Sequence, residues 1–194
     1  MIAFLDVHYQ GDIAYAAAVV CDDLTASSPT LEKVVRVYHI AAYEPGNFFK
    51  RELPCLLAVL QACPPVDHLV IDGNVWLDQG NMGLGAHLYE TLLRKVPVIG
   101  IAKTAYRGST DAHAVLRGTS QRPLYVTAAG MDPVVVAELV RHLHGPHRTP
   151  TLVTRADQLC RRCGEKQQRQ LTTVKQAIAV HCLHIPGLGA RTSN

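Results

Sequence analysis

The chain has 194 residues, of which 48% are hydrophobic and 18% are charged, and this is long enough for one globular domain with a substantial core. Its formal net charge of +3 is compatible with a polyanionic partner but does not identify one. No apolar run approaches the roughly 18 residues of a membrane-spanning helix, and no basic and apolar leader precedes the first apolar run. We therefore expect a soluble, cytoplasmic monomer that has no membrane partner.

The first part of the chain predicts three antiparallel strands, at residues 2–8, 13–21 and 32–40. The first two are apolar runs separated by the turn-forming sequence Gln10-Gly11-Asp12, which is typical of a β-hairpin. The third alternates polar with β-branched residues, so one of its faces should be solvated. Residues 51–63 then show helical spacing, with Pro54 expected in the first turn, where a missing backbone N–H is tolerated.

The following segments predict a strand, a helix and a strand, at residues 67–72, 83–95 and 96–103. Such a unit requires parallel strands joined by a right-handed crossover. Two more short strands and a helix are expected after it, at residues 113–118, 122–128 and 132–144. Beyond the turn-rich residues 145–150 the chain is again helical in pattern, with a helix expected at about 172 to 183.

This order of elements is that of the ribonuclease H-like fold. The expected fold class is therefore α/β, a ribonuclease H-like mixed five-stranded sheet of three antiparallel strands and then parallel strands, flanked by helices. In that fold the middle of the first strand lies beside the end of the fourth, so Asp6 and Asp72 should face each other.

Asp72 raises a question of charge, because it ends the apolar run Leu69-Val70-Ile71. A buried ionised carboxylate is costly unless it is paired, hydrogen-bonded or bound to a metal. Two carboxylates as close as Asp6 and Asp72 repel each other unless a divalent cation bridges them. Mg²⁺ is the oxygen-preferring candidate, and Mn²⁺ can substitute for it.

Six groups of short motifs occur in order from residue 2 to about residue 160. They are Asp6-Val7-His8-Tyr9, Tyr43-Glu44-Pro45-Gly46 with Arg51-Glu52, Val70-Ile71-Asp72-Gly73 with Gly83-Leu84-Gly85-Ala86-His87, Ile99-Gly100-Ile101-Ala102-Lys103, Pro123-Leu124-Tyr125-Val126-Thr127, and Thr154-Arg155-Ala156-Asp157. Through these motifs the chain resembles the endonuclease V family, nucleases that cut nucleic acid beside inosine, the product of adenine deamination. The resemblance implies a nucleic-acid repair enzyme, a metal-dependent endonuclease that hydrolyses a phosphodiester near inosine in DNA or RNA and leaves a 3′-hydroxyl and a 5′-phosphate.

The chemistry of the matched residues fits such a hydrolysis. The predicted catalytic residues are Asp6, Glu52, Asp72 and Lys103, and the predicted metal ligands are Asp6, Asp72 and Asp157. Mg²⁺ on these carboxylates would activate a water molecule, and Lys103 would stabilise charge on the phosphate or leaving group. The structural alternatives are an Asp6 bonded to turn amides, a Glu52 that caps its helix, a Lys103 on the surface and an Asp157 that only compensates a helix dipole.

A loop wedge and a base pocket are also implied by the resemblance. Tyr43 and Pro45 would form the wedge that holds a strand open while a base is extruded, although an aromatic residue could instead cover the end of the sheet. The base pocket would be formed by Gly46, Phe48, Gly83 and Tyr106. Glycine would let backbone amides approach the edge of the base closely. His87 is expected to be structural rather than catalytic.

The chain departs from the family pattern after Asp72. Val75 stands at the second glycine of the family's D-G-x-G-x-x-H-P-R run, and Asp78-Gln79-Gly80 replace His-Pro-Arg, where the family shapes its inosine pocket and nearby metal shell. We expect residues 1–164 to form the nuclease domain. Residues 165–194 are expected to form a helical extension that packs on the same domain.

Two other functions are compatible with parts of the sequence. Cys160 and Cys163, with His181, Cys182 and His184, have the ligand types of a structural zinc site, which would make the tail an interaction module on a nuclease-like core. The altered run after Asp72 is compatible with a catalytically silent nucleic-acid-binding paralogue, although such a protein has no physical reason to keep converging acids.

Overall fold

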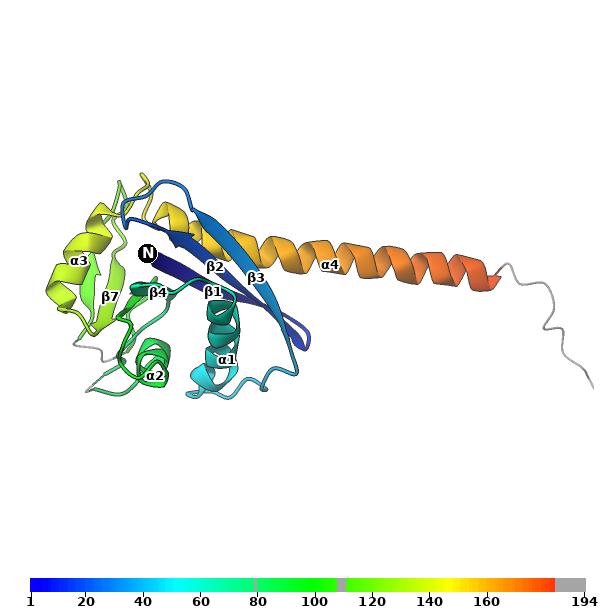
Figure 1. Cartoon of the computed structure of the whole chain (residues 1–194), viewed down its shortest axis with the longest axis horizontal. Helices are drawn as coiled ribbons and strands as arrows, with labels where there is room; N and C mark the ends of the chain where they lie inside the picture. Colours follow the sequence, from blue (N-terminus) through cyan, green and yellow to red (C-terminus); the bar gives the residue numbers. More distant parts are fainter. Residues whose placement is uncertain (79, 108–110, 184–194) are drawn as a thin grey trace, which may run out of the picture.

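The computed structural model of the chain describes residues 1–78, 80–107 and 111–183, and is a sheet with helices on both faces (Figure 1). The described strands form one seven-stranded sheet in the order β3-β2-β1-β4-β5-β7-β6. Their bounds are Ile2–Gln10 (β1), Ile13–Cys21 (β2), Leu31–Tyr38 (β3), His68–Asp72 (β4), Val98–Ala102 (β5), His113–Val115 (β6) and Leu124–Ala129 (β7). The helices are Phe48–Gln61 (α1), Leu84–Thr91 (α2), Pro133–His142 (α3) and Thr151–Leu183 (α4).

The strand pairings confirm the predicted mixed sheet of the ribonuclease H-like type. β1, β2 and β3 are antiparallel, and β1, β4 and β5 are parallel neighbours. The expected count of five strands is wrong for the described sheet, because β7 pairs antiparallel with β5 and β6 pairs with β7. The free edge of β5 would otherwise leave backbone hydrogen-bonding groups without partners.

Alternate residues of β1 serve two separate apolar layers, as the two-residue period of a strand requires. Phe4 belongs to the cluster that includes residues of α3 and α4, whereas Leu5 belongs to the cluster that includes residues of α1 and α2. Both residues are buried. The sheet is therefore covered on both faces, and polar groups of its central strands can reach solvent only at the strand ends.

Helix α1 begins earlier than its apolar spacing predicted. It starts at Phe48, so the expectation that Pro54 lies in the first turn is wrong, and Pro54 lies inside the helix. Its side chain is on the exposed face. The missing N–H therefore costs an internal hydrogen bond but places no bulk in the core.

Helix α4 is continuous from Thr151 to Leu183, and Figure 1 shows its second half extending beyond the sheet. The expected boundary between residues 164 and 165 falls within this helix. Contacts with β1 continue across that boundary, since Gly164 lies against His8 and Gln10 Nε2 donates to Gln168 Oε1 at 3.0 Å. No helix of the described residues is long and apolar enough to cross a membrane.

Arg117 organises the connection between α3 and α4. The residue is only 4% exposed, and its guanidinium group donates to five backbone carbonyl oxygens, one in the last turn of α3 and four in that connection. These acceptors belong to Arg141, Leu143, Gly145, His147 and Arg148. A buried guanidinium is tolerated when its donors are satisfied in this way.

Candidate active site

The register of β1 and β4 places two aspartates side by side. Leu5 of β1 pairs with Ile71 of β4 in parallel, and the next residue on each strand is Asp6 and Asp72. Neighbouring strands are about 4.8 Å apart, so these two residues are close at the carboxyl end of β4. The electrostatic interaction between the two carboxylates is one of the causes that raise the pKa of Asp6.

Glu52 of α1 approaches the same point. It is 6% exposed, and burial together with the charges of Asp6 and Asp72 raises its pKa to about 8. The alternative in which Glu52 caps its helix does not hold, because the N-cap is Asn47 and Glu52 lies inside α1. A buried carboxyl group whose pKa is raised by two neighbouring carboxylates indicates a site where a cation would be stabilised.

Asp6 is subject to the same effects. Burial raises its pKa to about 7, with further increases from Asp72 and Asp157, while a hydrogen bond from the Val7 backbone and the charge of Lys103 oppose the shift. Val7 N donates to Asp6 Oδ1 at 2.8 Å, so one oxygen does bond a backbone amide. The second oxygen, Oδ2, lies 4.0 Å from the weak donor Cys160 Sγ.

Lys103 supplies a cation in direct contact with Asp72. It follows β5, and its ammonium group donates to Asp72 Oδ2 in an ion pair. Burial lowers the pKa of Lys103, but the hydrogen bond and charge of Asp72 outweigh it, and the net shift is upward. Lys103 is therefore a charged partner of Asp72 rather than an isolated surface residue.

Asp157 of α4 completes the group of acids, since its charge acts on both Asp6 and Lys103. Arg161, one turn further along α4, donates to Asp157 Oδ1 at 2.6 Å. Cys160 is buried between them, with Sγ 4.0 Å from Asp6 Oδ2, and its pKa is raised to about 12 by burial and by Asp6 and Asp157. Cys160 is thus a neutral neighbour of the acids.

No group of three or more His, Cys, Asp or Glu side chains in residues 1–78, 80–107 and 111–183 is already arranged to hold a metal ion. At the acid cluster, the Lys103 ammonium forms an ion pair with Asp72, one of the predicted metal ligands. For the predicted zinc site, Cys160 is buried and Cys163 packs with it on the sheet. His184 of that site lies outside the described residues.

A cavity of about 290 Å³ opens beside the acids, with Asp72 in its lining. All four residues predicted for a base pocket line it: Gly46, Phe48, Gly83 and Tyr106. Phe49 lines it too and stacks on His87, with ring centroids 3.6 Å apart and an interplanar angle of 13°. His87 therefore supports the wall of the cavity from α2.

Two of the substitutions after Asp72, Val75 and Asp78, lie away from the cavity surface, whereas Gln79 is outside the described residues. The side chain of Val75 is buried in the core and faces the backbone of Gly85, and its N–H donates to Thr127 Oγ1 at 2.8 Å. Asp78 makes a turn with Asn81, whose backbone N–H donates to the Asp78 carbonyl at 2.7 Å. Neither Val75 nor Asp78 is in the cavity lining.

Tyr43 projects from the loop before α1. It is 62% exposed, and its ring meets that of Phe48 edge-to-face with centroids 6.5 Å apart. Such exposure is not that of a side chain covering the end of the sheet. Pro45, also exposed, is in the same loop.

Three further side chains near the site, those of Arg148, Arg51 and Tyr9, have no function predicted from the sequence. Arg148 lies in the turn-rich segment after α3, and its Nη2 donates to the backbone oxygens of Lys103 and, at 2.7 Å, Pro123. Arg51 and Tyr9 are motif residues that contact each other, with the guanidinium carbon 4.1 Å from the ring centroid. The motifs signalled this last pair, whereas no local pattern signals Arg148.

Comparisons with known proteins identify the family of the chain. The family model described as Endonuclease V matches residues 1–142. The Endonuclease V of Streptomyces avermitilis is 32% identical over 185 residues, covering 81% of this chain and 78% of that protein. The one from Streptomyces coelicolor is also 32% identical, over 184 residues, with 81% and 76% covered.

Solved structures show the same fold. The crystal structure of the Streptomyces avermitilis protein superposes with a TM-score of 0.70 at 29% identity, covering 86% of this chain and 82% of that chain. The catalytic domain of human Endonuclease V gives 0.71 at 22% identity, with 86% and 83% covered. The Ciona intestinalis protein, crystallised with a 23mer DNA containing an inosine followed by a ribo-adenosine, gives 0.69 at 18%, with 85% of each chain covered. From the match over residues 1–142 and these relatives, the chain belongs to the endonuclease V family.

Proposed function

We propose that the protein is a divalent-metal-dependent endonuclease that hydrolyses a phosphodiester near inosine in DNA or RNA, leaving a 3′-hydroxyl and a 5′-phosphate. The observation that carries the proposal is the convergence of Asp6, Glu52 and Asp72 with Lys103 beside a cavity that Asp72 lines. Family membership and the inosine-containing DNA bound by the Ciona intestinalis relative support the choice of substrate.

The acid cluster fits a hard dication. The raised pKa values of Asp6 and Glu52 mean that added positive charge would stabilise the ionised forms of both. Mg²⁺ is usually held by one or two carboxylates, with waters and substrate phosphate oxygens as its other ligands, so a complete protein cage is not required. Asp6 and Asp72 would hold the ion, with Asp157 nearby, and the ion would supply an activated water and charge stabilisation at phosphorus.

The other side chains of the site have separate tasks in this proposal. Lys103 carries its proton on Nζ and places positive charge at the carboxyl end of the parallel strands, where the phosphate would lie. Glu52, held protonated at neutral pH by its surroundings when no metal is bound, becomes an ionised acceptor once positive charge enters the site. Arg148 fixes the backbone of Lys103 and so the base of its side chain.

The cavity is proposed to take the flipped base. Phe48 and Tyr106 offer aromatic surface for stacking, and Gly46 and Gly83 expose backbone to the edge of a base. An added Cβ at Gly83 would come within 2.5 Å of the Asn74 carbonyl oxygen, so this position requires glycine for the segments to approach each other. Asp72 would then belong both to the lining of the base pocket and to the cluster of reactive acids.

A cleavage panel tests the proposal. Single- and double-stranded DNA and RNA, each with and without one inosine, are incubated with the full chain in Mg²⁺, in Mn²⁺ and in chelator. The proposal expects cutting that requires the metal and the inosine, with ends that a ligase accepts because they carry a 5′-phosphate and a 3′-hydroxyl. Tight binding with no cutting in either metal would instead identify a silent nucleic-acid-binding protein.

Replacing the proposed wedge should affect duplex substrates selectively. Tyr43→Ala is expected to slow cleavage of inosine in a duplex by about tenfold, because extruding a paired base costs a few kcal/mol that the wedge offsets. Cleavage of the same base in a single strand should change little. Single-turnover rates on both substrates measure this difference.

Tyr38 provides the matched control for Tyr43. It is 54% exposed and lies at the end of β3, away from the cavity lining. Tyr38→Ala should leave both rates unchanged. Equal slowing of the duplex and single-strand reactions by Tyr43→Ala would contradict a wedge and point to a general binding contact.

Arg148→Met should reduce the turnover of bound substrate, because it removes the donor that holds the Lys103 backbone while keeping an apolar stem of similar length. We expect kcat to fall by about tenfold or more with a smaller change in KM, since misplacing one electrostatic group mainly affects the transition state. Arg148→Lys should restore part of the rate. Arg122→Met, at an exposed arginine nearby, is the control. An increase in KM with kcat unchanged in Arg148→Met would argue against a positioning role.

A further inference from the structure

The positive charge of the chain is unevenly distributed. Residues 1–157 contain 13 Lys and Arg against 15 Asp and Glu, a formal charge of −2, although they hold the whole acid cluster and cavity. Residues 158–183, the remainder of α4, contain five basic residues against one acidic residue, a formal charge of +4. The five are Arg161, Arg162, Lys166, Arg169 and Lys175.

This basic part of α4 starts at the active site. Arg161 is one turn from Asp157 and forms an ion pair with it. The helix then runs along β1, with Gly164 against His8 and Gln168 bonded to Gln10, before it extends past the sheet (Figure 1). At 1.5 Å per residue, residues 158–183 span about 39 Å, which corresponds to roughly 11 base pairs of duplex.

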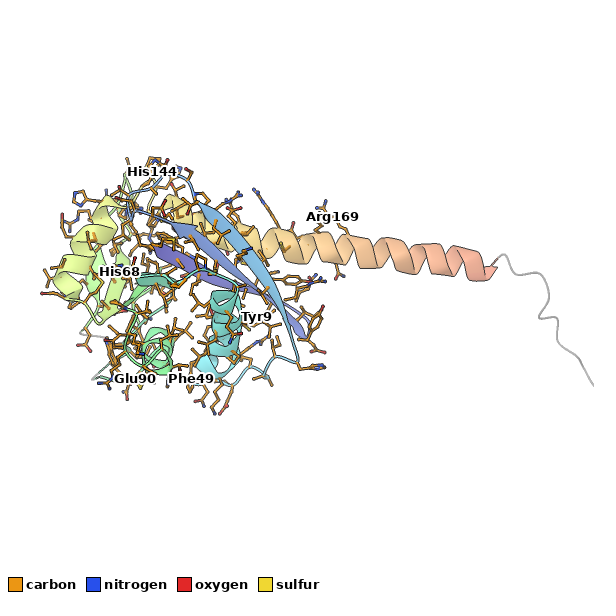
Figure 2. The ribbon with its side chains drawn as sticks, viewed as in Figure 1. Tyr9, Phe49, His68, Glu90, His144 and Arg169 are labelled. Carbon is orange, nitrogen blue, oxygen red and sulfur yellow. The ribbon has the colours of Figure 1, made fainter. Side chains whose placement is uncertain are left out.

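The face of α4 opposite the sheet carries like charges at helical spacing. Cys160 and Gly164 are buried, whereas Arg162 and Lys166, four residues apart on the same helix face, are exposed. Figure 2 shows Arg169 further along the helix, beyond the sheet. Like charges at this spacing repel each other, and a polyanion beside this face would offset that repulsion.

We propose that α4 beyond Asp157 is a contact surface for the phosphate backbone of the nucleic acid, and that it extends the binding track from the scissile phosphate to flanking nucleotides. This rests on the proposed function of the acid cluster, since both need the same substrate. A domain of net charge −2 attracts a polyanion poorly, and α4 supplies the missing attraction. Each phosphate that it neutralises releases a condensed counterion, which makes the contact dependent on salt and independent of sequence.

The composition of α4 favours nucleic acid over a membrane surface as the partner. A membrane-surface helix needs a strongly apolar face along its length. Between Glu165 and Lys175 the sequence is instead mostly charged or hydrogen-bonding, with the run Lys166-Gln167-Gln168-Arg169-Gln170 and the pair Thr172-Thr173. Direct continuity with Asp157 also places this surface next to the proposed scissile phosphate rather than at a separate site.

The test compares the parent with Arg162→Gln/Lys166→Gln in the full chain. Binding to an inosine-containing strand of 30 nucleotides is measured in Ca²⁺ over a series of salt concentrations. For the 30-mer, the variant should bind about tenfold more weakly at low salt, and its dependence of log Kd on log salt should be shallower by about 1 to 2.

Arg94→Gln/Lys95→Gln is the matched control, because these exposed residues follow α2 at the opposite end of the parallel strands. It removes one arginine and one lysine, as the α4 variant does, and should leave the affinity for the 30-mer unchanged. Equal losses in the two double variants would show a general effect of net charge and overturn the proposal. A variant that binds the 30-mer with the affinity and salt dependence of the parent, but has lost binding to anionic vesicles, would also overturn it.

Cleavage by the parent keeps the two proposals separable. If the parent cuts the 30-mer but the α4 variant binds it as tightly as the parent does, the contact surface fails and the proposed function stands. If the parent binds the 30-mer with the expected salt dependence but cuts nothing in Mg²⁺ or Mn²⁺, the proposed function fails and the contact on α4 stands.

Discussion

Asp6→Asn should abolish cleavage and at the same time stabilise the protein in chelator. Asparagine keeps the oxygen that accepts from Val7 N but removes the charge that a hard dication needs, so the rate should fall by about a thousandfold or more. The pKa of Asp6 is about 7 because the ionised form is buried among other acids. Above that pH the neutral amide should therefore raise the free energy of unfolding, on the order of 2 kcal/mol.

Denaturant unfolding at pH 8 and single-turnover cleavage measure the two effects. Asp12→Asn, in the exposed turn between β1 and β2, is the control and should change neither. Excess Mg²⁺ should stabilise the parent and the control but not Asp6→Asn, because the variant lacks the ligand. A variant that is less stable than the parent in chelator, yet still cuts, would show that Asp6 is a structural acceptor only.

In chelator, stability should decrease as the pH rises from about 4 to about 8. The pKa values of Asp6 and Glu52 rise from ordinary values of 3.8 and 4.5 in the unfolded chain to about 7 and about 8 in the folded chain. Between these values the folded state holds protons that the unfolded state releases, so the stability present below the unfolded pKa values is lost as the pH passes the folded ones. The combined loss should be on the order of 4 kcal/mol.

Saturating Mg²⁺ should change this pH profile in a specific direction. The metal competes with protons for the same carboxylates, so its stabilising effect should be small at pH 5 and increase toward pH 8. Thermal unfolding at several pH values, with and without the metal, gives both curves. Asp6→Asn/Glu52→Gln should flatten the curve in chelator, and an equally steep curve in that double variant would assign the pH dependence to other groups.

The sequence was sufficient to place Asp6 beside Asp72, because the order of elements determines which strands are neighbours and the apolar runs determine where each strand ends. Leu5 and Ile71 pair as that reasoning requires. It was not sufficient to predict which strands form the edge of the sheet beyond β5. Whether β6 and β7 join β5 depends on backbone groups that carry no side-chain signal, and so the predicted count of five strands was too low.

The direction of the side chains in the segment after Asp72 could not be predicted from the sequence either. Val75 stands where the resemblance places the inosine pocket, yet its side chain packs toward Gly85 in the core, while Gly73, Asn74 and Leu77 nearby line the cavity. A segment that reverses direction within ten residues has no period from which a face can be assigned. The predicted start of α1 was wrong for a related reason, because the apolar spacing around Pro54 does not show where the first helical turn begins.

The ion pair between Lys103 and Asp72 is a further contact that could not be predicted from spacing. It depends on the Lys103 side chain, one residue beyond the end of β5, reaching Asp72 at the end of the neighbouring strand β4, and Arg148 donates to the Lys103 carbonyl from a segment 45 residues away. The role of Asp157 likewise depends on where α4 crosses β1. Both contacts come from tertiary arrangement rather than from local motifs.

The buried guanidinium of Arg117 ties the stability of the site to an edge strand. Arg117 lies two residues after β6, a strand of three residues, and its five carbonyl bonds shape the connection from which Arg148 reaches the Lys103 loop. If β6 separates from β7, that connection loses its donors and Lys103 loses its backbone anchor together. Native-state hydrogen exchange should therefore show the amides of β6, of residues 143–148 and of the Lys103 loop opening as one cooperative unit, at a lower free energy than β1 and β4.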